Sequence, residues 1–285
     1  MKPLLEGKVI VMTGATSGLG RAACLSFANQ GARVIILARS RSKAEHLIKE
    51  LKDYATPKKG TIEVIKCDFS DLSQVNQACD TLLTDNTHID FLINNAGVWN
   101  FSESKSVNGI EMTFQVNVLV PLLLINKLLP LLKNSKEAKV ITTASALHHG
   151  EVNYTDIQFS KDYSSFKAYR QSKLMVILLT RLYATKEDFK YVKIVTQHPG
   201  LVDTGLARNG GWFARTFFKW FGKSAEKGAE TLIYLAQEDA DKLINGAYYA
   251  SSKATKTSTS FSKNLTHAEK VEELCLKYLS DYLKR

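Results

Sequence analysis

The sequence predicts an α/β fold of the doubly wound type, in which a parallel sheet of seven strands carries helices on both faces. Two observations support this prediction. Short runs rich in β-branched residues alternate with helical patterns from end to end, and the runs are apolar on both faces, as buried parallel strands are. No internal repeat and no linker rich in Pro, Gly or Ser interrupts the alternation, so residues 1–285 are expected to form a single domain.

Each element is expected where the apolar period changes. Short unbroken apolar runs predict strands at residues 8–12, 33–38, 62–66, 90–94, 138–143, 192–196 and 247–250. Apolar residues that recur every three or four positions predict helices at residues 18–30, 41–54, 72–84, 109–133, 166–186, 224–236 and 266–283. The longest apolar run, 118–125, contains Pro121 and is far shorter than the roughly 20 residues that cross a bilayer. No membrane-spanning segment is therefore expected.

The composition is that of a globular protein, with 45% hydrophobic and 23% charged residues, which excludes disordered and collagen-like classes. The net charge of +10 favours anionic partners, but Lys and Arg are spread along the chain, so a nucleic-acid partner is not expected. The cysteines show no paired spacing, which predicts free thiols in a reducing compartment and no metal site. They are Cys24, Cys67, Cys79 and Cys275. The N-terminal residues lack the apolar core and cleavage site of a signal peptide, so a cytoplasmic protein is expected.

A glycine-rich loop follows the first expected strand and reads Thr13-Gly14-Ala15-Thr16-Ser17-Gly18-Leu19-Gly20. Gly14 permits a tight turn, Gly18 lets backbone N–H groups approach a pyrophosphate, and Gly20 lets the helix pack close to the strand. The alternative is an ordinary glycine-rich turn. The position between a strand and a helix favours a dinucleotide as the ligand.

The end of the second expected strand indicates which dinucleotide binds. NAD-binding loops carry an acidic residue about 20 positions beyond the glycines, where it accepts hydrogen bonds from the ribose hydroxyls. Here the sequence reads Leu37-Ala38-Arg39-Ser40-Arg41 and contains no carboxylate. Arg39 can pair with a 2′-phosphate, helped by Arg21 or Arg41, so NADP(H) is expected. A solvated basic turn is the alternative.

A Tyr four positions before a Lys on a helix shares its face, so the ammonium favours the phenolate and is expected to lower the pKa of the phenol. The pattern occurs four times, at Tyr54/Lys58, Tyr163/Lys167, Tyr169/Lys173 and Tyr249/Lys253. Pro57 lies inside the first pair, and the last overlaps the seventh expected strand. Tyr163/Lys167 falls at the start of the expected helix, whereas Tyr169/Lys173 leads into its apolar stretch. Tyr169 and Lys173 are therefore the favoured pair.

Several of these residues together resemble a known family. Asn94-Asn95-Ala96-Gly97, Asn117, Ser145 and Tyr169-x-x-x-Lys173, with the glycine loop, resemble the short-chain dehydrogenase/reductase family over almost the whole chain. The separation of Ser145 and Tyr169, 169 − 145 = 24 positions, is similar to that in its retinol dehydrogenase branch. The resemblance implies a Rossmann fold with the strand order 3-2-1-4-5-6-7.

The resemblance also implies roles for single residues. Tyr169 would be the general acid in carbonyl reduction, Ser145 would bind the substrate oxygen, and Lys173 would hold the nicotinamide ribose. Asn117 would keep a water in a proton path. The residues implied in NADP(H) binding are Gly14, Thr16, Ser17, Gly18, Leu19, Gly20, Arg39, Asp68, Phe69, Asn95, Ala96, Gly97, Tyr169, Lys173, Pro199, Gly200, Val202 and Thr204. The sequence departs from the family pattern in two ways. Ala144 stands where many retinol dehydrogenase relatives have Ser, and the N-terminal membrane segment of those relatives is not found.

The segment 206–222 contains six large aromatic residues and no acid, and relatives place a substrate lid there, at about 201–223. Its apolar stripe predicts a lipophilic substrate, of retinoid, steroid or fatty-aldehyde type, and peripheral contact with a membrane through 206–223. A helix packed on the core is the alternative. Further pocket candidates follow the ends of strands, although polar loop surface is the favoured interpretation of the two adjacent histidines. These candidates are Trp99, His148, His149 and Tyr154.

The expected function is thus NADP(H)-dependent oxidoreduction of a hydrophobic carbonyl or alcohol. Two alternatives stay open. One is a cofactor-sensing or scaffold relative with little turnover, which an intact set of catalytic residues disfavours. The other is a 3-oxoacyl or sugar reductase, for which segment 206–222 is unusually aromatic. Family members often pair, so a homodimer is among the expected states, although the sequence identifies no interface.

Overall fold

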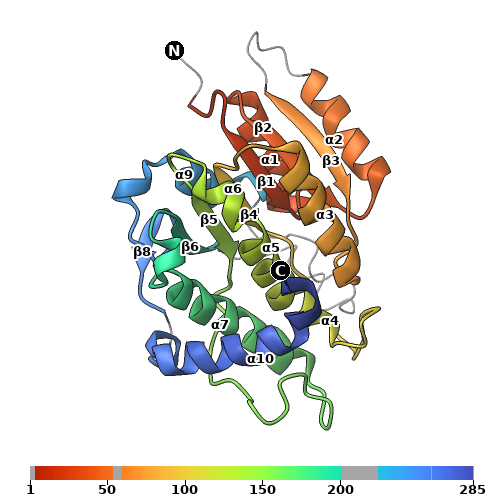
Figure 1. Cartoon of the computed structure of the whole chain (residues 1–285), viewed down its shortest axis with the longest axis vertical. Helices are drawn as coiled ribbons and strands as arrows, with labels where there is room; N and C mark the ends of the chain where they lie inside the picture. The colour runs from red at the N-terminus through yellow and green to blue at the C-terminus, as the bar shows by residue number, and fades with distance from the viewer. Residues whose placement is uncertain (1–3, 54–59, 201–223, 258, 285) are drawn as a thin grey trace.

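The computed structural model describes residues 4–53, 60–200, 224–257 and 259–284 (Figure 1). Their strands form one sheet in the order β3-β2-β1-β4-β5-β6-β7-β8. All neighbouring strands pair in parallel except β7 and β8, which pair antiparallel. The predicted α/β class and the predicted order of the first seven strands are confirmed.

The elements alternate along the chain as the sequence patterns predicted. The strands are β1 Val9–Thr13, β2 Arg33–Ala38, β3 Thr61–Lys66, β4 Phe91–Asn94, β5 Lys139–Thr143, β6 Lys193–His198, β7 Tyr248–Ala250 and β8 Lys253–Thr255. The main helices are α1 Gly18–Asn29, α2 Arg41–Asp53, α3 Leu72–Asp85, α5 Val120–Lys127, α7 Ser165–Tyr183, α9 Ala225–Gln237 and α10 Leu265–Leu283. The short helices are α4 Met112–Phe114 and α6 Leu129–Lys133, with a π-helical turn at Gln115–Leu119 and 3₁₀ turns at Glu187–Phe189, Ala240–Lys242 and Phe261–Lys263. No helix in the described ranges is long and apolar enough to cross a membrane.

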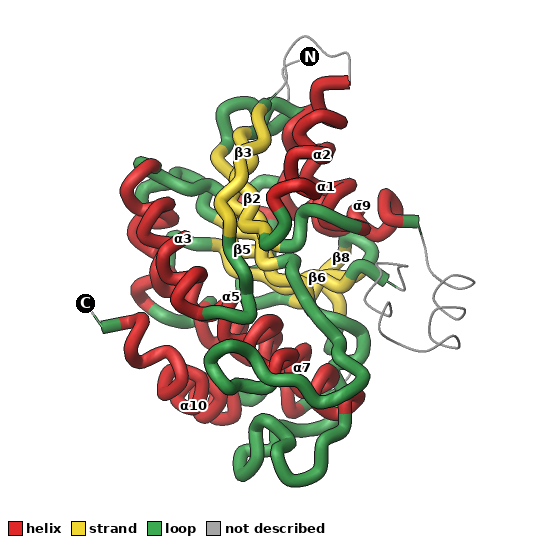
Figure 2. The backbone as a smooth tube through the Cα atoms, turned by 90° about the vertical axis from the view of Figure 1, so that its right-hand side faces the viewer, coloured by secondary structure: helices red, strands yellow, loops and turns green. Residues whose placement is uncertain are grey.

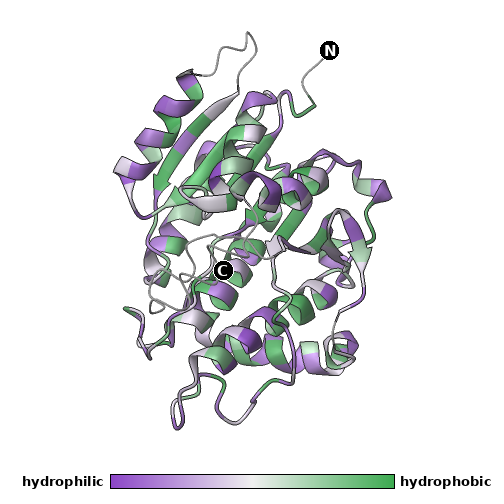
Figure 3. Ribbon diagram, turned by 180° about the vertical axis from the view of Figure 1, so that it is seen from behind, coloured by the Kyte–Doolittle hydropathy of each residue, from purple (hydrophilic) through white to green (hydrophobic). Residues whose placement is uncertain are grey.

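Each face of the sheet has its own core, because side chains alternate along every strand. On β1, Val9 and Val11 join the core under α3, α5, α7 and α10, whereas Ile10 and Met12 join the core under α1, α2 and α9. Figure 2 shows these two groups of helices on opposite sides of the sheet. In Figure 3 the strands in the middle of the sheet carry mainly hydrophobic colours, while the helices alternate between hydrophobic and hydrophilic ones. The sheet is therefore doubly wound.

The predicted count of seven strands is wrong, because an eighth strand, β8, extends the edge of the sheet. Its residues Lys253–Thr255 are exposed and polar, so no apolar run marks them. A tight turn joins β7 to β8, and in it Ser251 and Ser252 adopt positive φ values of 50° and 59°. Such a turn is usually built with Gly or Asn, so two serines gave no hairpin signal.

The single helix predicted over 109–133 is also wrong, since the segment is divided. Gly109 has a φ of +73°, and the Glu111 side chain caps the N-terminus of α4 by accepting from the N–H groups of Thr113 and Phe114. Pro121 has no N–H with which to close an α-helical bond to the carbonyl of Asn117, and the π-helical turn lies directly before it. The division places Asn117 inside that turn.

Candidate active site

The carboxyl ends of the parallel strands form one edge of the sheet. β1 and β4 lie side by side there, although two strands and three helices separate them in sequence. From this pair the sheet continues in opposite directions, through β2 and β3 beyond β1 and through β5 and β6 beyond β4. Ligands of open α/β sheets bind in the crevice outside such a switch point. The residues that the sequence singled out follow β1, β4 and β5, so the fold brings them to this edge.

The glycine loop has the geometry that its sequence predicted. Gly14 and Gly18 have φ values of +68° and +54°, in the region that favours glycine. A Cβ atom on Gly20 would lie 2.0 Å from the Gly14 carbonyl oxygen, so only glycine lets α1 start this close to the loop. Ser17 precedes α1 and makes no side-chain cap hydrogen bond, and the first turn holds no acidic residue. The N–H groups at this positive helix end thus suit an anion such as a pyrophosphate.

The loops after β1 and β4 are hydrogen-bonded to each other. The Thr13 hydroxyl accepts from the N–H groups of Asn95 and Ala96, each at 3.0 Å. The Asn95 side-chain amide donates to the Gly14 carbonyl oxygen at 3.0 Å. These bonds hold Asn95 and Ala96 against the glycine loop, where the resemblance places the wall beside the adenosine ribose.

Arg39 follows β2 and can contact an anion at the end of this strand. Its side chain is exposed, and it has no ion-pair partner in the described part of the chain. The two proposed helpers are engaged, because Arg21 pairs with Glu50 and Arg41 pairs with Glu45 at 3.0 Å. A 2′-phosphate would therefore meet Arg39 first.

The remaining residues implied in cofactor binding lie at the same edge where they are described. Asp68 and Phe69 follow β3, and the Asp68 carboxylate accepts from the N–H and hydroxyl groups of Ser70 at 3.0 and 2.9 Å. Pro199 and Gly200 follow β6 and line a hollow of about 190 Å³. Val202 and Thr204 lie outside the described residues, as do the proposed lid 201–223 and the proposed membrane contact within it.

Lys173 projects from α7 to the end of β5. Its ammonium donates to the Thr143 carbonyl oxygen at 2.9 Å and lies 5.8 Å from the centre of the Tyr169 ring. A Cβ atom on Gly97 would lie 3.4 Å from both Lys173 Nζ and Asn117 Oδ1, so these groups gather around one glycine. Burial lowers the pKa of Lys173 to about 8. One bond to Thr143 leaves further N–H donors of the ammonium for a ribose.

Asn117 connects the loop after β4 with α7. Its side-chain oxygen accepts from the Val98 N–H at 2.8 Å, and its amide donates to the Val98 carbonyl and the Ser172 hydroxyl, each at 3.0 Å. Ser172 in turn donates to the Tyr169 carbonyl at 2.7 Å. The side chain of Asn117 thus fixes the backbone on both sides of the site. The expected water in a proton path stays a prediction.

The phenol of Tyr169 is buried, and Ser145 is the polar side chain that acts on it. Burial raises the pKa of the Tyr169 phenol, and a hydrogen bond with Ser145 partly opposes the rise. The spacing of Tyr169 and Lys173 predicted a lowered pKa for the phenol, so the predicted direction is wrong. The pKa is raised because the phenol is desolvated by burial, and the Lys173 ammonium, 5.8 Å from the ring centre, does not offset this effect. The phenol is therefore protonated at neutral pH, as a proton donor would have to be.

The other Tyr/Lys pairs do not build such a site in the parts that are described. Tyr163 precedes α7 and its hydroxyl donates to the Asn100 carbonyl at 3.3 Å, while Lys167 is exposed. Tyr249 belongs to β7, and its hydroxyl accepts from the Ile244 N–H at 2.9 Å. Tyr54 and Lys58 lie outside the described residues.

The pocket candidates separate into two groups. Trp99 stacks on the Tyr169 ring, and His148 is buried with Nδ1 2.5 Å from the Ser145 carbonyl oxygen, so both border the site. His149 is exposed, and Tyr154 bonds to His267 of α10 at 2.9 Å. The two histidines thus differ, since one supports the turn that carries Ser145 and the other lies on the surface.

Sequence reasoning missed Thr143 and Gln197. The Thr143 hydroxyl donates to the Asn95 side-chain oxygen at 3.2 Å and accepts from the Gln197 amide at 2.9 Å, while its carbonyl holds Lys173. Thr143 therefore links three strand ends. The available signal was its position as the last residue of a strand, two before Ser145.

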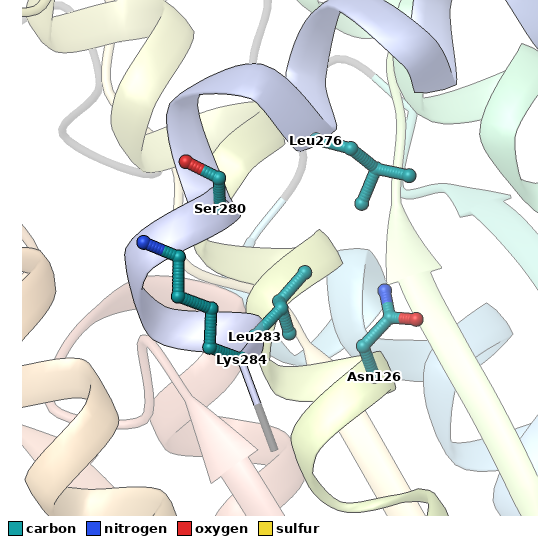
Figure 4. Close-up of a pocket in the computed structure, with 5 residues that line it drawn as sticks. All are labelled: Asn126, Leu276, Ser280, Leu283 and Lys284. Atoms are coloured by element: carbon teal, nitrogen blue, oxygen red, sulfur yellow. The ribbon is translucent and has the colours of Figure 1, made fainter.

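A larger hollow of about 440 Å³ lies elsewhere, between α5 and α10 (Figure 4). Asn126 lines it from α5, and Leu276, Ser280, Leu283 and Lys284 line it from the C-terminal part of the chain. None of the predicted site residues borders it. Size alone therefore does not identify the active site in this fold.

Known proteins share both the sequence pattern and the fold. Residues 8–211 match the family model of the short chain dehydrogenases. Mouse retinol dehydrogenase 14 is 37% identical over 265 residues, which cover 88% of this chain and 79% of that protein. A crystal structure of an uncharacterized protein from Mycobacterium paratuberculosis has a TM-score of 0.77 at 26% identity and covers 98% of this chain and 95% of that one. The RhlG/NADP active-site complex of Pseudomonas aeruginosa has a TM-score of 0.69 at 25% identity, with 88% and 98% covered.

The matched residues include the glycine loop, the loop that follows β4, and the helix α7, which carries Tyr169 and Lys173. The chain is accordingly an oxidoreductase that transfers a hydride with a nicotinamide cofactor. It belongs to the short-chain dehydrogenase family, in the branch that contains the retinol dehydrogenases.

Proposed function

We propose that the chain is an NADP(H)-dependent oxidoreductase that interconverts a hydrophobic carbonyl compound, of retinoid, steroid or fatty-aldehyde type, and its alcohol. The observation that carries the proposal is the grouping of Lys173 and Asn117 beside Gly97, with the centre of the Tyr169 ring 5.8 Å from the Lys173 ammonium and Ser145 acting on its phenol, at the same sheet edge as the glycine loop. The proposal treats residues 1–285 as one dinucleotide-binding domain, since one sheet supports both cores.

The proposed cofactor fits the groups at this edge. The first turn of α1 offers its N–H groups to the diphosphate, and Arg39 offers to a 2′-phosphate an exposed guanidinium that forms no ion pair with another described residue. The Pseudomonas relative is described as an NADP complex, which supports the same choice. Asp68, Phe69, Asn95, Ala96, Pro199 and Gly200 border the edge in the proposed binding roles, and Val202 and Thr204 keep theirs as predictions.

When bound, the cofactor supplies the hydride, and the chain controls the oxygen of the substrate. Ser145 Oγ would hold the carbonyl oxygen, and the Tyr169 hydroxyl would give it a proton as negative charge develops there. The raised pKa of Tyr169 keeps that proton on the phenol at neutral pH. Lys173 would hold the ribose, and Asn117 fixes the loop that ends at Val98.

Turnover of a long-chain aldehyde with NADPH, compared with NADH, tests the proposal. The wild-type chain is expected to prefer NADPH and the apolar aldehyde over a small polar one. Tyr169→Phe should lose activity by about 100-fold or more, the usual contribution of a positioned acid, while still binding NADPH. Equal activity of the variant would remove Tyr169 as the proton donor. NADPH binding by a wild-type chain without turnover of any carbonyl would support the cofactor-sensing alternative instead.

A further inference from the structure

A row of hydrogen-bonded side chains crosses the carboxyl edge of the sheet. Gln197 of β6 lies opposite Thr143 of β5 in the register of the two strands, and its amide donates to the Thr143 hydroxyl at 2.9 Å. That hydroxyl donates to the Asn95 side-chain oxygen at 3.2 Å, and the Asn95 amide donates to the Gly14 carbonyl oxygen at 3.0 Å. We call Gly14, Asn95, Thr143 and Gln197 the edge row. It joins the ends of β6, β5, β4 and β1, which are neighbours in the sheet.

The direction of the edge row is fixed from its Gly14 end. A carbonyl oxygen only accepts, so the group of Asn95 that faces Gly14 must be its NH₂, and its oxygen must face Thr143. The one hydroxyl hydrogen of Thr143 is then committed to Asn95. The Gln197 amide turns its NH₂ to Thr143, although its own buried oxygen then has no donor among the described residues. Because an unpaired buried oxygen is costly, this orientation indicates that the Gln197 amide serves the row.

The Asn95 amide packs against the two glycines that shape the phosphate loop. A Cβ atom on Gly14 would lie 2.9 Å from Asn95 Nδ2, and a Cβ atom on Gly20 would clash with it. The amide therefore occupies the space that these glycines leave open between the loop and the start of α1. A change in its orientation would disturb the loop whose N–H groups face the expected diphosphate.

Thr143 reaches the other end of the expected cofactor site through its backbone. Its carbonyl oxygen accepts from the Lys173 ammonium at 2.9 Å, and both residues are buried. The hydroxyl of Thr143 thus acts toward the glycine loop, whereas its carbonyl acts toward the ammonium that is expected to hold the nicotinamide ribose. A substitution that removes only the hydroxyl separates these two connections.

We propose that Thr143 is a positioning residue for the cofactor, because its hydroxyl orients the Asn95 amide and the amide holds the glycine loop in the form that binds the diphosphate. Gln197 is a second positioning residue, since it fixes the direction of the edge row. This inference rests on the dinucleotide binding of the proposed function and deepens it. The hydroxyl of Thr143 affects the affinity for the cofactor and not the proton transfer proposed for Tyr169.

Binding of NADPH, NADH and ADP, measured by titration calorimetry, tests the proposal, because ADP contains the diphosphate but lacks the nicotinamide and its ribose. Thr143→Val keeps the shape and the backbone carbonyl and removes the hydroxyl. It should raise the Kd of all three ligands by about three- to tenfold, the range for one lost hydrogen bond. Thr143→Ser keeps a hydroxyl and should bind all three within about twofold of the wild type. At saturating NADPH the kcat of Thr143→Val should stay within about twofold of the wild-type value, since Lys173 keeps its carbonyl partner.

Thr142→Val is the matched control. Thr142 is also buried on β5 but points to the other face of the sheet, where its hydroxyl accepts from the Asn94 amide at 3.5 Å. Its Kd values should equal those of the wild type, even if both valine variants lower the free energy of unfolding alike. Wild-type Kd values in Thr143→Val, or the same rise in Thr142→Val, would overturn the proposal. A rise for NADPH and NADH without one for ADP would also overturn it, because the effect would then lie at the nicotinamide end.

Gln197→Met removes the donor at the far end of the edge row and should raise the three Kd values by a smaller factor. The double variant with Thr143→Val should bind no more weakly than Thr143→Val alone, because both residues act through one row. Independent effects would multiply, and that result would overturn the role of Gln197.

These binding measurements need no carbonyl substrate, which keeps the inference separate from the proposed function. A chain that binds the three ligands in the expected pattern and reduces no carbonyl loses the proposed reduction and keeps the role of Thr143. A wild-type chain that binds none of the three ligands would overturn that role as well.

Discussion

Lys173 donates a 2.9 Å hydrogen bond to the carbonyl oxygen of Thr143, so the ammonium of α7 is tied to the end of β5. Because the Lys173 side chain is buried, its pKa is lowered from 10.5 to about 8. Lys173 is thus charged below about pH 8 and neutral above it. Any contribution that needs its positive charge is present at neutral pH and is lost as the pH rises.

This titration predicts a pH profile. The kcat/KM for carbonyl reduction should fall as the pH rises through about 8, because Lys173 loses its charge there. Tyr169 does not cause the fall, since burial raises the pKa of its phenol and keeps it protonated in this range. In Lys173→Arg the guanidinium stays charged, so the fall near pH 8 should disappear even if the overall rate is lower. A fall at the same pH in Lys173→Arg would assign it to another group.

Arg39→Ala should raise the Kd of NADPH by about tenfold or more and leave the Kd of NADH unchanged, because the 2′-phosphate is present in the first cofactor alone. Arg41→Ala is the matched control, since Arg41 lies two positions after Arg39 and already pairs with Glu45. Titration calorimetry with both cofactors gives the comparison. An equal loss for NADPH and NADH in Arg39→Ala would contradict a contact with the 2′-phosphate.

His148→Ala should lower the kcat of carbonyl reduction by about tenfold with little change in the Kd of NADPH. The imidazole holds the Ser145 carbonyl, and without it the turn that carries the Ser145 hydroxyl loses its position. His149→Ala removes the exposed neighbouring imidazole and should leave kcat unchanged. If the two variants behave alike, His148 does not act through Ser145.

Lys139 predicts an effect on stability away from the site. Its buried ammonium donates to the carbonyl oxygens of Leu235, Ala236 and Glu238 at the end of α9 and lies 4.6 Å from the centre of the Phe91 ring. Lys139→Met leaves those carbonyls without this donor and should lower the free energy of unfolding by roughly 1–3 kcal/mol at pH 7. Lys242→Met, which removes an exposed ammonium at the same end of α9, should change it by less than about 0.5 kcal/mol.

The pH dependence of unfolding gives a second measure of Lys139. Burial lowers its pKa from 10.5 to about 8, so the folded chain releases a proton that the unfolded chain still holds. The free energy of unfolding should therefore rise between about pH 8 and 10, and the rise should be smaller in Lys139→Met than in Lys242→Met. Urea unfolding at several pH values measures both slopes. Identical slopes in the two variants would contradict the buried state of this ammonium.

The sequence predicted the parts of the fold that have a local signal. The apolar runs placed β1 to β7, and the strand-to-helix position gave the glycines of the first loop their meaning, as the positive φ values of Gly14 and Gly18 confirm. β8 was missed because its three residues are polar and exposed at the edge of the sheet. The division of 109–133 was missed because a π-helical turn keeps the apolar content of a continuous helix.

In the candidate site, the residues that belong to a family motif could be predicted from the sequence. The hydrogen bonds that join them could not. Thr143 links Asn95, Gln197 and Lys173 only because β4, β5 and β6 are neighbours in a particular register. The raised pKa of Tyr169 likewise depends on burial, which a spacing of four residues does not report. The spacing of Tyr169 and Lys173 identified the candidate acid, whereas the burial of the phenol determines its pKa.

Hydride transfer by this chain can be followed with NADPH that carries deuterium at both positions of the reactive carbon of its nicotinamide. A hydrophobic aldehyde is incubated with the labelled cofactor and the wild-type chain, and the alcohol is analysed by mass spectrometry. The alcohol should carry one deuterium on its carbinol carbon, and Tyr169→Phe should lower the rate at which it forms by about 100-fold or more. An alcohol without deuterium, or the same rate of labelling in Tyr169→Phe, would contradict hydride transfer with Tyr169 as the proton donor.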